Sequence, residues 1–378
     1  MRVAIDGMPL ASPLTGIGHY TLELAKGLAA VSSTDDFALV SPAPFLPNAA
    51  LEVKHNSLAN LSQVNLKSNR LNRYWWGLRL PLYLTGSSFD LFHGTNYDIP
   101  RWSNVPSIVT IHDLSLLLHH HTHEARLVQR ARRRLPAVAR SARMIITGSD
   151  SVKREIVEHL KVRSERVAVT PYAQRSVFKP ISLPESMDTR KRLGIEGDFI
   201  LFVGTIEPRK GLLTLVDAYA DLLRNSDLTP QLVIAGGKGW LMSDFMSSVS
   251  ARGLEDRIRF TGYLADQDLA ALYSSCAAFV YPSIYEGFGL PPLEAMACGA
   301  AVITTDIPVL RETVGTAACL VAPAGSDQLA RAIANVMQDK SYRERLSRAG
   351  LEQSTRFSWE RTARLTLDVY NEALRGGA

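Results

Sequence analysis

The sequence predicts an α/β protein with two Rossmann-like domains, each a doubly wound, open parallel sheet covered by helices. Short β-rich runs alternate with longer helical patterns along all 378 residues, and this alternation is typical of parallel strands joined by crossover helices. At roughly 150 residues per domain, the length accommodates two domains. The stretch 178–184 contains two prolines that break any helix, and a new strand starts at Phe199, so we expect a linker there.

The expected strands divide the chain into two halves. In the first half they are residues 2–6, 37–40, 91–93, 107–111, 143–148 and 167–170. In the second half they are residues 199–204, 231–235, 258–261, 278–281 and 301–304. We therefore assign residues 1–180 to the first domain and residues 190–357 to the second. A final amphipathic pattern, 359–376, has no strand after it, so it either caps the second domain or crosses back to the first.

Composition excludes several classes of protein. The chain is 46% apolar and 21% charged, with 25 glycines and 19 prolines, which is ordinary for a globular protein and rules out collagen-like, low-complexity and disulfide-scaffold chains. No stretch reaches the ~18 consecutive apolar residues of a spanning helix. The amino terminus is typical of a strand rather than a signal sequence, so we expect a cytoplasmic protein. Three cysteines in apolar surroundings are expected to be reduced, and no metal framework can be built from them.

The net charge of +5 is unevenly distributed. Residues 1–180 carry 22 Lys+Arg against 13 Asp+Glu, whereas the rest of the chain carries 20 against 24. The surplus is concentrated in 67–79, which includes Trp75 and Trp76, and in the arginine-rich stretch 126–143. These segments either attach the protein to an anionic membrane surface or form a solvated helix face and an ordinary packed aromatic pair. A nucleic-acid partner is not expected, because no nucleic-acid-binding module is recognisable.

The most informative motif follows the strand that ends at Tyr281. A glycine-bearing turn leads into a helix whose first turn holds Pro291 and Pro292, where a missing N–H is tolerated. Backbone amides at such a helix start, together with the helix dipole, favour an anion such as a diphosphate. The amides in question belong to Gly287, Phe288, Gly289 and Leu290. Two carboxylates, Glu286 and Glu294, flank this turn and suit sugar hydroxyls, although Glu294 alone would also be a favourable acid near a helix start.

A second anion site is expected after the strand that begins at Phe199. Arg209 and Lys210 stand where a helix begins, at a strand's carboxyl end, so they are placed to face a ligand phosphate. Either cation alone would be equally well explained as a solvated loop charge.

Two features of the first half carry weaker signals. Gly16 and Gly18 lie where the first strand leads into a helix, and this pair only loosely matches a dinucleotide fingerprint. It suits a loop that brings backbone amides close to a phosphate or an acceptor. His112 follows another strand and either contacts a sugar or is satisfied in the core, while Asp113 caps the next helix.

Together these segments resemble glycosyltransferase family 4, the retaining enzymes of the GT-B fold, over nearly the whole chain. The spacing of Glu286 and Glu294 within the motif at 285–291 is the most specific part of the resemblance. The resemblance implies two domains that face a cleft, the first for the acceptor and the second for the nucleotide sugar. It implies that Glu286 binds donor-sugar hydroxyls, that Glu294 holds the ribose, and that Arg209 and Lys210 neutralise the diphosphate.

Further roles are implied by the same resemblance. His112 would touch the donor sugar, Tyr263 and its turn would meet the nucleobase, and Gly236 would lie near the phosphates. The amides of Phe288 to Leu290 would assist at the diphosphate. Many family members have an arginine where this chain has Thr205, so the grip on the diphosphate depends mainly on the pair at 209–210.

The function that follows is retaining transfer of a hexosyl group. Cations and helix amides stabilise the charge that develops on the departing diphosphate, so we expect neither a divalent metal nor any other cofactor. The resemblance to bacterial mannosyltransferases of O-antigen and exopolysaccharide synthesis favours GDP-mannose as donor and a lipid-linked saccharide as acceptor. Other GDP-, UDP- or dTDP-sugars remain open, and the rival functions are a nicotinamide-dependent dehydrogenase and a basic scaffold without catalysis.

Three further patterns are discounted. Asp266 and Asp268 mimic a metal-binding Asp-x-Asp motif, but Asp266 is better explained as a helix cap. The histidines at 119–123 lack a carboxylate framework and are expected to form a polar loop. The glycines at 236–239 lack the ending of a P-loop.

Overall fold

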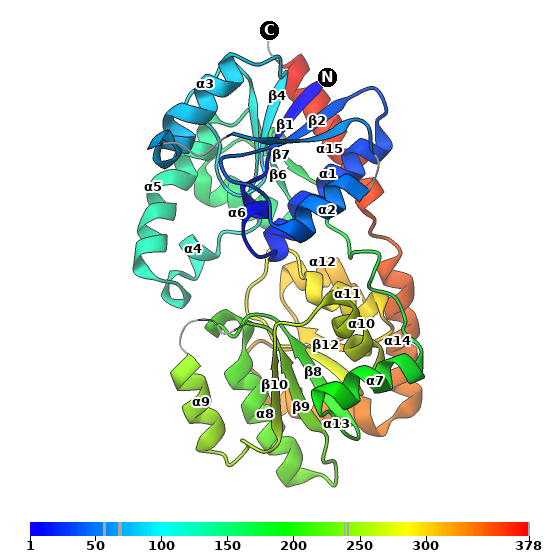
Figure 1. Ribbon diagram of the computed structural model, residues 1–378. Helices are drawn as coiled ribbons and strands as arrows, with labels where there is room; N and C mark the ends of the chain where they lie inside the picture. The colour runs from blue at the N-terminus through cyan, green and yellow to red at the C-terminus, as the bar shows by residue number, and fades with distance from the viewer. Residues whose placement is uncertain (56–57, 67–69, 238, 240–241, 377–378) are drawn as a thin grey trace. The chain divides into compact units, whose positions relative to one another are not determined.

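The computed structural model describes residues 1–55, 58–66, 70–237, 239 and 242–376, and within them the chain forms two compact units (Figure 1). The first unit comprises Met1–Ala173 and Ser358–Ala378, and the second comprises Gln174–Phe357. The boundary at 173 precedes the linker predicted at 178–184. The difference arises because Phe178 is buried in the second unit, where its ring lies 5.8 Å from that of Tyr273.

The first unit contains a seven-stranded sheet in the order β3-β2-β1-β4-β5-β6-β7. All of its pairings are parallel, and the strand order reverses between β1 and β4. The strands are β1 Arg2–Asp6, β2 Asp36–Ser41, β3 Leu61–Asn65, β4 Leu91–Gly94, β5 Ser107–Thr110, β6 Met144–Thr147 and β7 Val167–Val169. The helices around it are α1 Gly16–Val31, α2 Pro47–His55, α3 Leu80–Thr85, α4 Ser115–Leu118, α5 Ala125–Ser141 and α6 Asp150–Leu160.

The second unit contains a six-stranded parallel sheet in the order β10-β9-β8-β11-β12-β13. The strands are β8 Phe199–Val203, β9 Gln231–Ala235, β10 Ile258–Gly262, β11 Ala278–Tyr281, β12 Val302–Thr305 and β13 Cys319–Val321. The helices are α7 Leu183–Leu193, α8 Leu212–Asn225, α9 Met242–Ser250, α10 Asp266–Ser275, α11 Leu290–Ala297, α12 Pro308–Val314, α13 Ser326–Gln338 and α14 Lys340–Ser354. Two parallel sheets covered by helices confirm the predicted fold class.

The central strands are continuous apolar runs because helices cover both of their faces. All five residues of β8 are buried, and β11 is buried throughout. The sequence did not predict the edge strands β3 and β13, whose residues are mostly half-buried or exposed. Strand β3 carries polar side chains and lacks an apolar run, and β13 has only three residues, so neither gives the signal that makes a buried strand recognisable.

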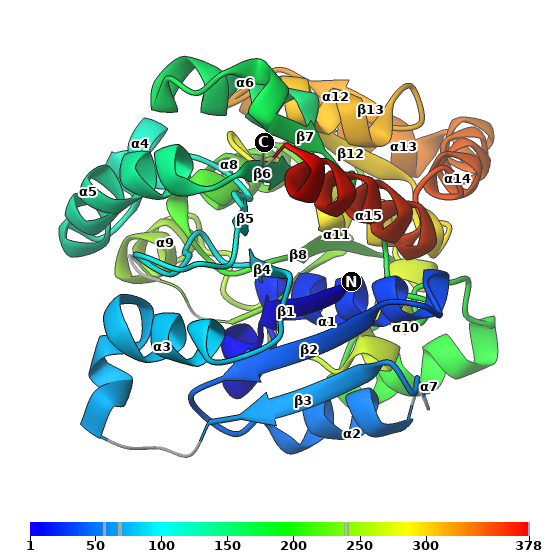
Figure 2. The same ribbon diagram turned by 90° about the horizontal axis from the view of Figure 1, so that it is seen from above.

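The last helix, α15 (Trp359–Arg375), belongs to the first unit and packs along α1, as Figure 2 shows. A Cβ on Gly27 would lie only 3.0 Å from the carbonyl oxygen of Trp359, so glycine permits this close approach. The Tyr370 hydroxyl lies 2.7 Å from His93 Nδ1 on β4. These contacts tie α15 to α1 and the first sheet.

The tryptophan pair of the first unit is packed against the protein. Trp75 is 4% exposed and belongs to the core, and the ring of Trp76 lies edge-on to that of Phe92 at 6.3 Å. The expectation that this pair meets lipid headgroups is therefore wrong for Trp75, and the packed alternative holds for it. Among the helices of the described residues, none has both the length and the apolar content that a bilayer crossing requires.

Candidate active site

The loops after β8 and β11 are joined by backbone contacts that position the predicted cations. The Ile284 amide donates to the carbonyl oxygen of Arg209 over 2.9 Å, and Ser283 Oγ lies 3.0 Å from the same oxygen. Gly211 has a φ of +68°, and a Cβ there would lie 2.0 Å from the carbonyl oxygen of Pro282. Only glycine fits at this position, which lets the turn carrying Lys210 lie against the loop that leads to Glu286.

Glu286 and Lys210 meet in a buried hydrogen-bonded cluster, with about 8% of each residue exposed. Glu286 Oε1 accepts hydrogen bonds from Lys210 Nζ over 2.6 Å, the Tyr281 hydroxyl over 2.8 Å and the Ser283 hydroxyl over 2.6 Å. Arg209 Nη1 lies 3.5 Å from the other oxygen, Oε2. Because three donors occupy Oε1, Oε2 is the oxygen with capacity for a further donor such as a sugar hydroxyl.

The charges of the cluster keep the Glu286 carboxylate ionised. Burial alone would raise its pKa, but the charges of Lys210 and Arg209, with hydrogen bonds from Lys210 and Ser283, outweigh burial and lower the pKa to about 2. Burial and the nearby Arg209 lower the pKa of Lys210, while Glu286 opposes this shift. The site therefore presents a fixed negative charge held by two cations.

Glu207 is a member of the cluster that the sequence analysis missed. Its Oε1 lies 2.6 Å from Arg209 Nη2, and its side chain is 6% exposed. The sequence signal that could have identified Glu207 is its position in the same loop, two residues before Arg209. The two carboxylates and two cations thus form an alternating, buried charge network at the carboxyl ends of β8 and β11.

Helix α11 begins as the motif predicted. Pro291 and Pro292 lie in its first turn, and Gly289 precedes it with a φ of +96°. A Cβ on Gly289 would lie 2.6 Å from a methyl carbon of Leu310 on α12. The ring of Phe288 is buried, and its carbonyl oxygen accepts a hydrogen bond from Thr313. Contacts with Leu310 and Thr313 of α12 thus hold the turn at 287–290 in place.

Glu294 lies one turn into α11 and has specific partners, so a simple role as a first-turn acid is excluded. The Tyr273 hydroxyl donates to its Oε2 over 3.3 Å, and Arg175 Nη2 lies 3.8 Å from its Oε1. Burial raises the pKa of Glu294 to about 7, with Arg175 opposing and Asp266 adding to the effect. Its protonation therefore changes near neutral pH.

The remaining predicted donor residues of the second unit lie at the same edge of its sheet. A Cβ on Gly236 would lie 2.0 Å from the carbonyl oxygen of Gly204, and the Gly236 amide donates to the carbonyl oxygen of Gly262 over 2.9 Å. Thr205 is exposed, and Tyr263 is 70% exposed. The structure thus places these residues at the carboxyl ends of β8, β9 and β10, where parallel sheets bind ligands. Their contacts with a nucleotide stay predictions.

His112 is buried in the first unit with both ring nitrogens bonded. Nε2 donates to the carbonyl oxygen of Thr95 over 2.8 Å, so Nδ1 accepts from the Tyr172 hydroxyl, also at 2.8 Å. Burial lowers the His112 pKa to about 4, so the ring is neutral. Asp113 accepts from the Ser115 amide at the start of α4, but the N-cap position of this helix is Leu114 and not Asp113. Contact of His112 with a sugar stays a prediction, and it requires the ring to exchange one of these two bonds.

The two glycines of the first unit differ. Gly16 is exposed at the start of α1, and a Cβ there would meet nothing within 4 Å. Gly18 is buried, and a Cβ there would lie 2.9 Å from a Leu14 methyl carbon. Packing therefore explains Gly18 but not Gly16.

The discounted patterns have mixed outcomes. Asp266 is the first residue of α10 rather than its cap, and it forms an ion pair with Arg175, because that arginine reaches the start of the helix. Asp268 pairs with Arg192 over 2.6 Å. Within the described part of the chain, no three His, Cys, Asp or Glu side chains gather as metal ligands.

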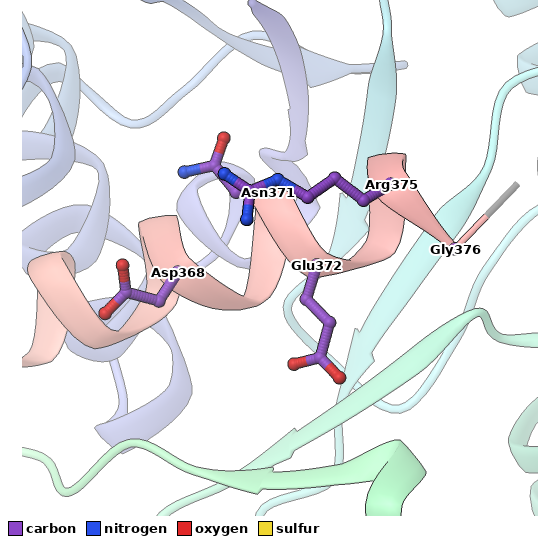
Figure 3. Close-up of a pocket in the computed structure, with 5 residues that line it drawn as sticks. All are labelled: Asp368, Asn371, Glu372, Arg375 and Gly376. Carbon is purple, nitrogen blue, oxygen red and sulfur yellow. The ribbon is translucent and has the colours of Figure 1, made fainter.

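A surface hollow of about 540 Å³ lies along α15, and none of the candidate residues lines it (Figure 3). It is lined by Asp368, Asn371, Glu372, Arg375 and Gly376. The mixed charges of these exposed residues form no buried polar cluster like that around Glu286.

Comparison with known proteins accounts for both units. Residues 14–173 match the model of Glycosyltransferase Family 4, and residues 186–353 match that of Glycosyl transferases group 1. The chain is 32% identical to O-antigen chain mannosyltransferase B of Escherichia coli, over 98% of this chain and 99% of that protein. The chain belongs to glycosyltransferase family 4. This membership decides against the dehydrogenase and the scaffold.

Other relatives of this glycosyltransferase differ in function and length. This chain is 32% identical to the serotype-specific mannosyltransferase WbdA of Escherichia coli, over 60% of this chain and 28% of that protein. It is 30% identical to D-inositol 3-phosphate glycosyltransferase of Kribbella flavida, over 98% and 95% of the two chains. The crystal structure of Anabaena HepE with UDP-glucose superposes with a TM-score of 0.78 at 18% identity, covering 98% of this chain and all of that one. This last similarity identifies the GT-B fold.

Proposed function

We propose that this glycosyltransferase moves a mannosyl group from GDP-mannose, with retention of configuration, onto a lipid-linked saccharide in the synthesis of a bacterial surface polysaccharide. The observation that carries the proposal is the buried cluster of Glu286, Lys210, Arg209 and Glu207 at the carboxyl ends of β8 and β11. The full-length similarity to an O-antigen chain mannosyltransferase supports the choice of sugar and pathway.

The chemistry follows from the charges of the cluster. The acceptor hydroxyl oxygen forms a bond to the anomeric carbon, the bond from that carbon to the diphosphate oxygen breaks, and the hydroxyl proton passes to the departing phosphate. Arg209 and Lys210 stabilise the negative charge that grows on this leaving group, and they do so more in the transition state than in the ground state. No divalent metal or other cofactor takes part in the proposed step.

Glu286 orients the sugar in this scheme. Its Oε2 accepts a hydrogen bond from a sugar hydroxyl while Oε1 stays bonded to Lys210, Tyr281 and Ser283. Because the same lysine contacts the carboxylate, binding of the sugar and of the diphosphate is linked through one ammonium group. Glu294 holds the ribose, and Tyr263 contacts the base.

A membrane surface is the proposed site of the lipid-linked acceptor. The first unit exposes the apolar side chains of Tyr74, Leu78, Leu82 and Trp102, each 37–53% exposed. Helix α5 adds exposed arginines opposite its buried apolar face, and Figures 1 and 2 both place α3 and α5 on one side of this unit. The exposed arginines of α5 are Arg126, Arg130, Arg132, Arg133 and Arg140. Apolar side chains beside clustered arginines suit an anionic lipid surface.

Co-sedimentation with vesicles tests this surface. Replacing Arg126, Arg130 and Arg133 with alanine is expected to reduce binding to vesicles that contain phosphatidylglycerol and to leave the weaker binding to neutral vesicles unchanged. The control replaces three exposed arginines of the second unit. These control residues are Arg192, Arg224 and Arg311. Equal losses in both triple variants would show that net charge, and not this surface, governs binding.

Thermal unfolding with a panel of nucleotide sugars tests the donor. A ligand at 100 times its Kd stabilises the folded state by about 2.7 kcal/mol, which corresponds to roughly 5–11 °C for a unit of this size. We expect GDP-mannose and GDP to raise Tm, and UDP-glucose and a dTDP-sugar to raise it less. A larger increase in Tm with UDP- or dTDP-sugars would indicate that one of these sugars, and not GDP-mannose, is the donor. Stabilisation by NADH alone would contradict the proposed function.

A further inference from the structure

Arg175 links two carboxylates of the second unit. It follows the unit boundary directly, and its side chain is 14% exposed. Its Nη1 pairs with Asp266 at the start of α10, and its Nη2 lies 3.8 Å from Glu294 Oε1 on α11. Its guanidinium carbon lies 4.9 Å from the centre of the Phe178 ring. An arginine held by an aromatic ring and a carboxylate has little freedom, so it presents a fixed positive charge to Glu294.

The groups around Glu294 explain why this charge matters. Asp266 and Tyr273 face it from α10, and Cys298 directly follows the end of α11. The pKa of Tyr273 is raised well above its ordinary value by burial, so its hydroxyl stays neutral. Helices α12 and α14 pack against the α11 segment through Leu310 and Gly350, which bring no charge. Among these groups Arg175 is the one cation, and it opposes the burial that favours protonated Glu294.

We propose that Arg175 is a positioning residue for the donor ribose: its guanidinium orients Glu294 and favours the ionised carboxylate, which accepts hydrogen bonds from the ribose hydroxyls. This inference rests on the proposed function. An ionised acceptor makes roughly twice as strong a hydrogen bond as a neutral one. Asp266, in turn, orients Arg175. Arg175 therefore acts through Glu294 without touching the nucleotide.

The pH dependence of nucleotide affinity gives this role a distinct signature. In the wild-type protein Glu294 ionises near pH 7, so affinity for GDP is expected to rise between pH 6 and pH 8. Without Arg175 the same carboxyl group ionises at higher pH. We expect Arg175→Met to weaken GDP binding about tenfold at pH 7. The reason is that a hydrogen bond to a neutral carboxyl group is weaker than one to a carboxylate, and this difference corresponds to a change in Kd on the order of tenfold. The loss is expected to shrink toward pH 9.

Calorimetry of GDP, UDP and inorganic pyrophosphate between pH 6 and pH 9 tests the inference. Each variant is compared with wild type at the same pH, so protonation of the ligand cancels in the ratio of Kd values. Pyrophosphate lacks a ribose, and its affinity is expected to be unchanged in Arg175→Met. The matched control is Arg192→Met, because Arg192 pairs with Asp268 on the same helix α10 at 2.6 Å. Its Kd ratio is expected to stay near one at every pH.

Two more variants keep the test decisive. Glu294→Gln removes the titrating group, so adding Arg175→Met to it is expected to change GDP affinity little at any pH. Arg175→Lys retains the charge and is expected to shift the pH profile less than Arg175→Met, and it replaces that variant if the latter does not fold. Two results would overturn the role of Arg175. One is a ratio of the Arg175→Met Kd to the wild-type Kd for GDP that does not change with pH, and the other is an equal loss of affinity for GDP and pyrophosphate. Failure of the wild-type protein to bind GDP or UDP at all would instead refute the proposed function.

Discussion

Replacing Lys210 with methionine tests how the buried charge cluster is held together. Lys210 Nζ donates to Glu286 Oε1 over 2.6 Å and to the Tyr281 hydroxyl over 2.7 Å. Removing one partner of a buried ion pair costs about 3–5 kcal/mol, because the other charge stays buried. The pKa of Glu286 leads to a similar value. A carboxyl group whose pKa falls from 4.5 to about 2 on folding contributes about 3 kcal/mol at neutral pH.

Thermal unfolding of Lys210→Met measures this cost. For a unit of this size we expect Tm to fall by roughly 6–20 °C at pH 7. The stabilisation from the lowered pKa of Glu286 is complete above pH 4.5 and disappears as the pH falls toward 2, so the difference from wild type is expected to shrink in acid. The double variant Lys210→Met/Glu286→Gln removes both charges and is expected to recover most of the loss.

The control for this experiment is Lys340→Met. Lys340 lies 3.8 Å from Glu344, and both side chains are more than half exposed. Exposed pairs contribute about 0–1 kcal/mol, so this variant is expected to unfold close to the wild-type Tm. Equal Tm values for Lys210→Met and Lys340→Met, or a double variant as unstable as Lys210→Met, would refute the reasoning about the cluster.

Three further predictions concern the scaffold. Gly211→Ala is expected to lower Tm strongly, since its Cβ would collide with a backbone carbonyl oxygen. Gly197→Ala has a similar φ of +61° but nothing within 4 Å of its Cβ, so it is expected to lower the free energy of unfolding by only about 1 kcal/mol. Equal changes of Tm in the two variants would contradict this. Tyr370→Phe removes the hydroxyl that bonds His93 Nδ1 and is expected to destabilise the first unit by about 1–3 kcal/mol, measured by chemical denaturation; an unchanged midpoint would count against an anchoring role for α15. Burial lowers the pKa of His93 to about 3 and of His112 to about 4, so the unfolded chain binds more protons than the folded chain below pH 6.5. Each histidine is therefore expected to lower the free energy of unfolding by about 2 kcal/mol at pH 5. A Tm of the first unit that does not change from pH 7 to pH 5 would contradict this.

The sequence predicted the buried strands well, for a physical reason. Strands covered on both faces are continuous apolar runs, as in β8 and β11, and these runs are visible without any knowledge of the fold. Edge strands such as β3 are half exposed and carry polar side chains, so they lack that signal. The unit boundary at 173 was also missed, because proline positions do not reveal that Phe178 packs into the second core.

The candidate site was predictable to the level of the strand ends. Glu286, Arg209 and Lys210 follow parallel strands, and the carboxyl ends of such strands share one edge of a sheet, so their convergence follows from topology. Side-chain partners do not follow from topology. The pairing of Glu207 with Arg209 and the contact of Arg175 with Glu294 depend on packing that no spacing encodes. For the same reason the sequence could not decide whether His112 was free, and the structure shows both of its nitrogens bonded.

The most direct test of the proposed transfer is the release of GDP from GDP-mannose in the presence of a lipid-linked saccharide acceptor. Glu286→Gln keeps the shape of the side chain and removes its charge, and the control is Glu344→Gln on the exposed face of α14. We predict acceptor-dependent GDP release by the wild-type protein and by the control. In Glu286→Gln we predict a rate lower by on the order of 100-fold or more, with GDP-mannose binding largely retained. Turnover in Glu286→Gln within a few-fold of wild type would contradict the central role of this carboxylate.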